Sequence, residues 1–377
     1  MTSQRSPSRR QVVCGLLGGA IGSVLPLPVF AAEPQSLKAV AAEKGFLFGS
    51  SVGTGRAGTL TGSFADPRYL EILRQECSIL VPENELKSYV IAAVRDRYDF
   101  EPGDRIASFA KNAGIKLRGH TLLWNRDKYM PAWLRDSFPA LSAAEGERFL
   151  RSYIQRVCSH YGEQIHSWDV VNETVDPQTG QVRETPFTHV LGFDALRIAY
   201  EAAREHAPHA QLVYNDYMSW EAGGEAHRAG VLRLLERFRK SNVPVDALGI
   251  QSHLGNNGNI HAEQRAQWRA FVDEAVSMGY RLLITELDIN DKDLPAEVIA
   301  RDAQVAAIAR DYLDLMLSYR GLDQVLCWGL VDKYSWLQNF SPRADKTPQR
   351  PNPYDEAFRR KPLWQAIAAA FAAAPAR

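Results

Sequence analysis

Eight short apolar runs, rich in β-branched residues, recur along this chain at intervals of 32 to 49 residues. Each interval is long enough for a strand, a loop, a helix and a return loop. Several runs are nearly continuous in apolar residues and then end in polar ones, which is typical of parallel strands covered on both faces. The pattern therefore predicts a fold in which strands and helices alternate. The runs begin near Phe46, Ser78, Lys116, Ile165, Gln211, Ala247, Arg281 and Gln324.

Helix signals lie between these runs. Asp66 precedes a proline in the manner of a helix cap, and Ser142 with Glu145 has the form of a capping box. Eight strand and helix units fit an α/β fold of the (β/α)8 TIM barrel type over residues 32–377. A doubly wound open sheet is the alternative, but its phosphate-binding glycine pattern is missing after the first run. We expect residues 368–377 to form a fraying terminal helix and tail.

Residues 1–31 have the order of an export signal. Arg9 and Arg10 precede a mostly apolar run from Val12 to Phe30, which small residues follow. The paired arginines also resemble a twin-arginine signal, whose passengers leave the cytoplasm folded. A membrane anchor is the alternative, although glycine and proline interrupt the run, which is barely long enough to span a bilayer. We therefore predict cleavage after Ala31 or Ala32 and a periplasmic or secreted protein.

Charge and cysteine content exclude several classes of protein. The chain has 44 Lys and Arg against 44 Asp and Glu, so no positive field is available for nucleic acid. Removal of the signal takes Cys14 away and leaves Cys77, Cys158 and Cys327. An odd number in an oxidising compartment leaves at least one thiol, most simply a buried one. We expect a monomer without cofactor, nucleic-acid partner or, after signal removal, membrane contact.

Polar residues accumulate where the predicted strands end. In a barrel of this kind the C-terminal strand ends converge on one face, so these side chains should meet there. Burying carboxylates and amides costs several kcal/mol unless they are paired, so folding alone does not account for them. The residues at strand ends are Glu83, Asn84, His120, Trp124, Asn172, Glu173, Asn215, Asp216, Gln251, His253, Glu286, Asp288 and Trp328.

Two glutamates end strongly apolar strands. Glu173 follows the fourth run and Glu286 lies in the seventh, so the two should face each other across the barrel mouth. Such a carboxylate pair suits glycoside hydrolysis, in which one group protonates the leaving oxygen and the other attacks carbon or activates water. The alternative is a structural pair of buried glutamates satisfied by arginines. Asn172 also begins a glycosylation sequon, but a strand end inside a barrel mouth is a poor acceptor.

Tryptophans and histidines at the same end refine this interpretation. Trp124, Trp328 and Trp336 offer flat faces for sugar rings, with core packing as the alternative. His120 and His253 raise the question of a metal. No HxH pair or HExxH helix completes a ligand set, so we predict no metal site.

Seven motifs in a fixed order resemble those of glycoside hydrolase family 10, the endo-1,4-β-xylanases with a (β/α)8 barrel. The resemblance covers essentially the whole chain after the signal. It rests on Glu83-Asn84-Glu85-Leu86-Lys87, RGHTLLW at residues 118–124, WDVVNE at 168–173, YNDY at 214–217, GIQSH at 249–253, ITELD at 284–288 and WGLVDKYSW at 328–336.

The resemblance implies a retaining, double-displacement reaction in which Glu286 is the nucleophile and Glu173 the general acid and base. Such carboxyl groups lie roughly 5–5.5 Å apart. Glu173 must hold a proton near neutral pH, which requires a pKa raised by an apolar setting and a nearby negative charge. Glu286 must stay ionised, with His253 as its hydrogen-bond partner and Asp288 orienting that histidine. Asn172 is expected to bind the sugar 2-hydroxyl.

Substrate-binding residues are implied by position. Tyr217 would stack on the leaving-group side, and close walls at the −1 sugar would exclude the hydroxymethyl group of glucose. Asn125 and Met218 depart from the family pattern, which commonly has His and Asn there. A β-1,4-glucanase of the same mechanism and a non-catalytic sugar-binding barrel are the alternatives. Glu83, Asn84, Lys87, His120, Trp124 and Gln251 would line the glycone subsites, with Trp328 and Trp336 as walls.

Overall fold

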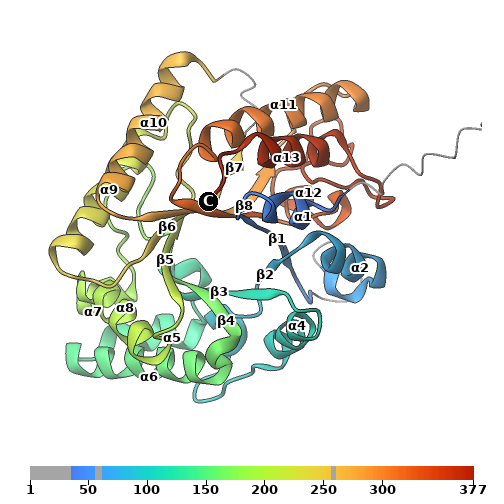
Figure 1. Ribbon diagram of the computed structural model, residues 1–377. Helices are drawn as coiled ribbons and strands as arrows, with labels where there is room; N and C mark the ends of the chain where they lie inside the picture. Colours follow the sequence, from blue (N-terminus) through green and yellow to red (C-terminus); the bar gives the residue numbers. More distant parts are fainter. Residues whose placement is uncertain (1–34, 56–61, 256–259) are drawn as a thin grey trace, which may run out of the picture. The chain divides into compact units, whose positions relative to one another are not determined.

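Eight parallel strands form the closed centre of the fold (Figure 1). The computed structural model describes residues 35–55, 62–255 and 260–377, so the predicted export signal and Cys14 lie outside the described residues. Neighbouring strands pair in chain order, and the pairings of β1 with β9 and of β6 with β8 close the barrel. The predicted (β/α)8 barrel is therefore confirmed. Its strands are β1 (Leu47–Val52), β2 (Ile79–Pro82), β3 (Lys116–Trp124), β4 (Ile165–Asn172), β5 (Gln211–Asp216), β6 (Ala247–Ile250), β8 (Arg281–Ile289) and β9 (Leu322–Cys327).

A two-residue strand, β7 (His253–Leu254), follows β6 after a break and pairs with the distal end of β8. The break holds Ser252 in the left-handed backbone region, with φ of 63°. This step redirects the chain at the mouth of the barrel. It places His253 opposite Asp288 in the β7 to β8 register.

Helices surround the strands in Figure 1. The predicted caps are present, because Asp66 accepts a hydrogen bond from the Arg68 backbone and Ser142 forms a reciprocal capping box with Glu145. The helices are α1 (Leu37–Ala42), α2 (Pro67–Glu76), α3 (Ser88–Ile91), α4 (Glu101–Asn112), α5 (Ala132–Ser137), α6 (Ala143–Tyr161), α7 (Pro186–Leu191), α8 (Asp194–His206), α9 (Glu225–Lys240), α10 (Ala262–Ser277), α11 (Val298–Met316), α12 (Leu337–Phe340) and α13 (Pro362–Ala373).

The interior of the barrel is filled by tight packing between neighbouring strands. Gly119 on β3 is paired in register with Trp168 on β4. A Cβ atom on Gly119 would lie 2.0 Å from the Trp168 ring, so only glycine leaves room for this indole. The close approach fixes β3 against β4, the two strands that carry His120 and Asn172 to the mouth.

The C-terminal segment is docked, and the expectation that it frays was wrong. Phe371 of α13 is fully buried, and its ring centroid lies 5.4 Å from that of Phe46. The Arg377 guanidinium lies over the Phe46 ring at 4.1 Å, and its backbone N–H donates to the Lys44 carbonyl at 2.9 Å. The alanine-rich composition suggested a loose end, but the aromatic residue within it covers the start of β1.

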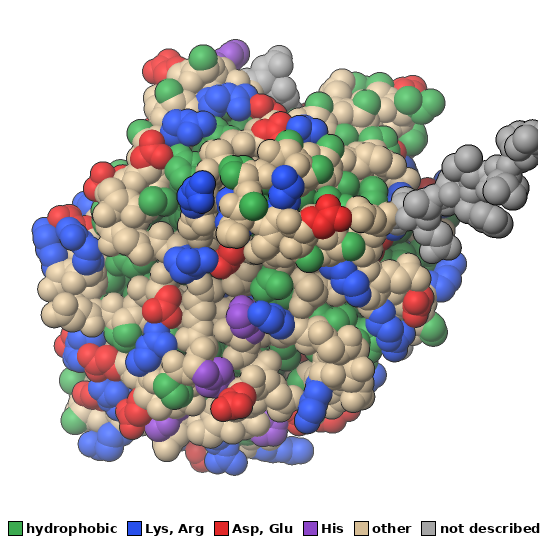
Figure 2. Space-filling model, in the orientation of Figure 1, with side chains coloured by type: hydrophobic (Ala, Val, Ile, Leu, Met, Phe, Trp, Pro, Cys, Tyr) green, Lys and Arg blue, Asp and Glu red, His purple; other side chains and the backbone are tan. Residues whose placement is uncertain are grey.

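Cys77, Cys158 and Cys327 are buried free thiols, as expected of small apolar side chains. In the described ranges, no helix is both long enough and apolar enough to cross a bilayer. Figure 2 shows basic and acidic side chains interspersed over the visible face, rather than gathered into a field of one sign.

Candidate active site

Amide and carboxylate side chains carried by four different strands meet in one hydrogen-bond network at the barrel mouth. Asn215 donates from Nδ2 to Asn172 Oδ1 at 3.0 Å and to Glu286 Oε1 at 2.8 Å. Gln251 donates from Nε2 to Glu173 Oε1 at 3.2 Å and to Asn172 Oδ1 at 3.3 Å. Both predicted catalytic glutamates are thus joined through shared neighbours, although they stand far apart in the sequence.

The Glu286 carboxylate lies among hydrogen-bond donors and positive charges. It is 5% exposed, and Nε2 of His253 lies 3.2 Å from its Oε2 atom. Burial alone would raise the pKa of Glu286, but the His253 hydrogen bond and the charges of His120, His253 and Lys87 lower it to about 2. This carboxylate is therefore ionised at neutral pH, as a nucleophile requires.

His253 is held in place by a second carboxylate. Its Nδ1 atom lies 2.9 Å from Asp288 Oδ1. Burial would lower the pKa of His253, but the charge and hydrogen bond of Asp288, together with those of Glu286, raise it to about 10. The imidazole is consequently protonated at neutral pH and donates from both ring nitrogens. The expected orienting role of Asp288 agrees with this geometry.

Glu173 has polar rather than apolar surroundings. It is 9% exposed, and Arg126 donates from Nη1 to its Oε2 at 2.8 Å, so the expectation of an apolar setting was wrong. The backbone of Glu173 is left-handed, with φ of 53°, and its N–H donates to the Asn215 carbonyl at 2.9 Å. Such a backbone is uncommon for a non-glycine residue and is frequent at functional sites. Here it directs the chain away from β4 immediately after Asn172.

One donor in this network has no protein partner. Asn172 is 1% exposed; its Oδ1 accepts two hydrogen bonds, but its Nδ2 has no partner within the described part of the chain. A buried polar group without a partner costs about 1–3 kcal/mol, which a ligand acceptor would offset. This Nδ2 group is suited to a substrate hydroxyl, as the predicted role of Asn172 requires.

The two predicted tryptophan walls lie beside His253, which contacts Glu286. Trp336 donates from its indole N–H to Asp288 Oδ2 at 2.7 Å, and its ring centroid lies 5.1 Å from that of His253. Trp328 is 7% exposed and meets the His253 ring edge-on at 6.4 Å. Trp336 is thus held by a hydrogen bond, whereas Trp328 is held by its burial among neighbouring side chains.

A second group of predicted residues lies on the β2 and β3 side of the mouth. The Lys87 ammonium lies 4.4 Å from the Trp124 ring centroid and 5.9 Å from that of Trp328. Burial and the neighbouring Glu85 raise the pKa of Glu83, Lys87 opposes this, and the resulting pKa is about 8. Glu83 can therefore act as a proton donor as well as an acceptor toward a sugar hydroxyl.

Two further predicted binding residues, Asn84 and Tyr217, are each held by a hydrogen bond from a neighbouring side chain. Asn84 accepts from the Tyr89 hydroxyl at 2.6 Å. Tyr217 accepts from Arg183 Nη2 at 2.8 Å, and its ring lies edge-on to His227 at 4.9 Å. These contacts restrict the orientation of both side chains.

His120 is supported by a buried ion network that sequence reasoning did not include. Its Nδ1 atom lies 2.8 Å from Asp169 Oδ2, and Arg118, which is fully buried, forms an ion pair with the same carboxylate. The signal was present, because Asp169 is a charged residue between the apolar residues Trp168 and Val170.

Two further residues of the site, Asn215 and Arg126, had no predicted role. Asn215 stood among the strand-end residues, which was the available signal. Arg126 follows β3 in a loop, where no local pattern indicates that it reaches Glu173. Asn125, which departs from the family pattern, is buried and donates to the Thr174 hydroxyl at 2.6 Å, so it joins the loops after β3 and β4.

Comparison with known proteins agrees with this geometry. The model of glycosyl hydrolase family 10 matches residues 36–370. The chain belongs to glycosyl hydrolase family 10. An endo-1,4-beta-xylanase 5 from Pyricularia oryzae is 32% identical to this glycosyl hydrolase over 328 residues, covering 84% of this chain and 75% of the relative. An endo-1,4-beta-xylanase B from Paenibacillus barcinonensis is 30% identical over 287 residues, covering 73% and 84%.

Solved structures resemble this family 10 hydrolase along nearly its whole length. The crystal structure of xylanase 10B from Thermotoga petrophila in complex with xylobiose superimposes with a TM-score of 0.78 and 27% identity, covering 90% of this chain and 98% of that one. Xylanase 10B from Thermotoga maritima gives a TM-score of 0.77 at 27% identity, covering 89% and 98%.

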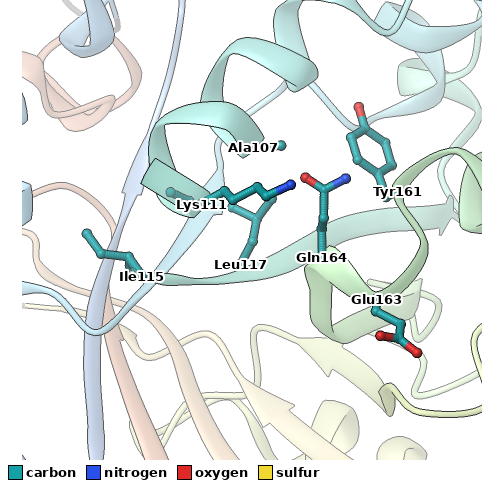
Figure 3. A pocket seen from close by; sticks show the side chains of 8 residues that line it. Ala107, Lys111, Ile115, Leu117, Tyr161, Glu163 and Gln164 are labelled. Carbon is teal, nitrogen blue, oxygen red and sulfur yellow. The ribbon is translucent and has the colours of Figure 1, made fainter. Parts of the chain in front are cut away.

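A separate hollow of about 440 Å³ in this hydrolase lies at the start of β3, away from the strand ends that carry the glutamates (Figure 3). Lys111 and Gln164 point toward one another there, whereas the Glu163 carboxylate points away from both. It contains no carboxylate pair, so it does not compete as a hydrolytic site. Among the described residues, no group of three or more His, Cys, Asp and Glu side chains is arranged to hold a metal ion.

Proposed function

We propose that this family 10 hydrolase is a retaining endo-1,4-β-xylanase acting on xylan or xylo-oligosaccharides. Glu286 attacks the anomeric carbon while Glu173 transfers its proton to the glycosidic oxygen, which leaves with the rest of the chain. Water, deprotonated by Glu173, then cleaves the glycosyl ester and restores both carboxyl groups. The observation that carries the proposal is the ionised, donor-surrounded Glu286, connected to Glu173 through Asn172, Asn215 and Gln251.

The contacts around Glu286 support different roles for the neighbouring side chains. The protonated His253 and the Asn215 amide keep Glu286 ionised and aimed at one point. The unpartnered Nδ2 of Asn172 is available to a 2-hydroxyl, whose hydrogen bond strengthens as positive charge develops on the sugar ring. Preorganised donors of this kind stabilise the transition state without reorganising during the reaction.

Preference for xylose over glucose follows from the fixed walls. Trp336 is held by its hydrogen bond to Asp288, and Trp328 is nearly enclosed, so neither can retreat from an added hydroxymethyl group. Rejection by steric exclusion needs no attractive contact to xylose itself. A roomier site would instead favour the same chemistry on β-1,4-glucan.

Two measurements test the proposed activity. Initial rates on soluble xylan and on carboxymethyl cellulose should differ strongly in favour of xylan, and a preference for cellulose would establish the glucanase instead. Proton NMR of the first product should show the β anomer before mutarotation. An α product, or no hydrolysis of either polymer, would contradict the retaining xylanase.

Export in monomeric form is also part of the proposal. The charged, apolar and small-residue order of residues 1–31 supports an export signal, and the paired Arg9 and Arg10 support the twin-arginine route. Replacing both arginines by lysine should retain the enzyme in the cytoplasm.

Light scattering on the processed enzyme should give the mass of one chain, and a dimer mass would contradict the monomer.

A further inference from the structure

The side-chain amide of Asn215 lies at the centre of the hydrogen-bond network of the site, and both of its ends are engaged. Its Nδ2 group donates to Asn172 Oδ1 at 3.0 Å and to Glu286 Oε1 at 2.8 Å. Its Oδ1 atom accepts from the Thr285 hydroxyl at 2.7 Å. Because Asn215 is fully buried, bulk water does not replace a partner that is removed.

The contact between Asn215 and Thr285 crosses a strand of the barrel. Asn215 lies on β5 and Thr285 on β8, and β6 pairs with both of these strands. The β6 residue in register with Asn215 is Gly249. A Cβ atom on Gly249 would lie 2.5 Å from Asn215 Oδ1 and 3.2 Å from the Thr285 methyl group. The missing side chain of Gly249 therefore opens the path over β6.

The hydrogen bonds through Asn215 run in one direction. Thr285 donates to Asn215, Asn215 donates to Asn172, and the Nδ2 group of Asn172 remains for a substrate hydroxyl. An amide has one donating end and one accepting end. If the Asn215 amide were turned over, its oxygen would face Oδ1 of Asn172 and the ionised Glu286, which are both acceptors. The direction of this amide thus decides whether Glu286 has a donor or a repelling oxygen beside it.

Thr285 is well placed to hold the accepting end of that amide. Its side chain is 1% exposed, and it immediately precedes Glu286 on β8. The same strand therefore carries the nucleophile and the hydroxyl that orients the neighbour of the nucleophile. A shift of β8 would move both groups together, so their alignment with Asn215 is kept.

We propose that Thr285 is a positioning residue of the hydrolytic site. Through its hydroxyl it fixes the Asn215 amide with the donating end toward Glu286 and Asn172, and it does so without touching substrate. Donors that are fixed in advance stabilise the charge that develops in the transition state rather than the bound substrate. The inference rests on the proposed function and adds a residue to the machinery of the same site.

Three variants test the proposal with a xylo-oligosaccharide as substrate. Thr285→Val keeps the shape of the side chain but lacks the hydroxyl, so kcat should fall about tenfold, the size of one buried hydrogen bond. KM should change less than about twofold, because the lost interaction acts mainly in the transition state. Thr285→Ser retains the hydroxyl and should keep most of the activity. Gly249→Ala places a methyl group against Asn215 Oδ1 and should lower kcat with Thr285 intact.

Thr185→Val is the matched control. The hydroxyl of Thr185 is also buried and donates to Asn125 Oδ1 at 2.7 Å, but this pair joins the loops after β3 and β4 instead of contacting Glu286. Thr185 is in addition the N-cap of α7, so its replacement should lower Tm at least as much as Thr285→Val does. Its kcat should nevertheless equal that of the unmodified enzyme.

A crystal structure of Thr285→Val tests the geometry independently of turnover. In this variant, Nδ2 of Asn215 should lie farther than roughly 3.5 Å from Glu286 Oε1, beyond the reach of a hydrogen bond. An unchanged distance of 2.8 Å would overturn the inference, whatever the activity of the variant.

The kinetic outcomes separate the two proposals. An unchanged kcat in Thr285→Val, an equal loss in Thr285→Ser, or an equal loss in Thr185→Val would overturn the positioning role and leave the xylanase proposal intact. An unchanged kcat in Gly249→Ala would refute the path over β6. Hydrolysis of neither xylan nor xylo-oligosaccharides by the unmodified enzyme would overturn the xylanase proposal, and the crystal structure would still decide whether Thr285 fixes Asn215.

Discussion

The Nε2 atom of His253 lies 3.2 Å from Oε2 of Glu286, and this contact joins a protonated imidazole to an ionised carboxylate. The pair is set by backbone geometry, because the β7 to β8 register places His253 beside the strand that carries Glu286. Its electrostatic state has consequences for pH dependence, for catalysis and for stability.

The first prediction concerns the stability of the enzyme at alkaline pH. The pKa of His253 is about 10 in the folded chain, against roughly 6.5 for an unfolded histidine. The raised value means that its stabilisation is complete below about pH 6.5 and is lost as the pH rises through 10. Tm should therefore fall over this range, and the fall should be smaller in His253→Gln. Identical slopes in both proteins would contradict the assignment.

The same pair predicts acid tolerance at Glu286. Its pKa of about 2 lies below that of an unfolded glutamate, so its contribution to stability is present above about pH 4.3 and is lost as the pH falls through 2. Glu286→Gln should therefore show a flatter decline of Tm between pH 5 and pH 2 than the unmodified enzyme does. A steeper decline in the variant would mean that folding raises the pKa of Glu286 instead of lowering it.

Loss of the nucleophile should abolish turnover. Glu286→Gln keeps the shape of the side chain but removes the attacking charge, and kcat should fall on the order of 10⁴- to 10⁶-fold, as in other covalent enzymes. Glu163→Gln is the matched control, because it makes the same chemical change in the hollow at the start of β3, away from the two glutamates. Equal rates for the two variants on xylan would remove Glu286 from the reaction.

The loss of activity caused by removing the acid should depend on the leaving group of the substrate. Glu173→Gln should reduce kcat/KM on xylan by about 10²–10⁴-fold, because a sugar leaving group needs a proton. An aryl xylobioside with an acidic phenol leaves without that proton, so its first step should be affected far less. The measurement is a burst of phenol release followed by slow turnover; an equal loss on both substrates would argue against the acid role.

The buried network behind His120 should contribute strongly to stability. Asp169→Asn leaves Arg118, which is fully buried, without its carboxylate, and this should cost about 3–5 kcal/mol in chemical denaturation. Asp104→Asn breaks an exposed contact with His160 on the helical surface and should cost at most about 1 kcal/mol. Comparable losses in the two variants would mean that Asp169 does not compensate Arg118.

Much of this site could be predicted because it lies at strand ends. The apolar runs located the strands, and the barrel geometry then required polar residues at their ends to converge. Glu286, His253 and Asp288 occupy the predicted places relative to one another. The expectation failed for the surroundings of Glu173, because Arg126 reaches it from a loop whose course no periodic pattern encodes. The left-handed backbone of Glu173 could not be predicted from the sequence either, since glutamate rarely adopts this conformation.

The pairing of β1 with β9 connects the first strand of the barrel to the last. During synthesis, every other barrel strand is made before Leu322–Cys327 leaves the ribosome, and until then both β1 and β8 lack a neighbour along one edge. Such open edges attract other chains. The nascent enzyme therefore depends on rapid completion, or on a chaperone that covers those edges, before it can become an independent folded unit.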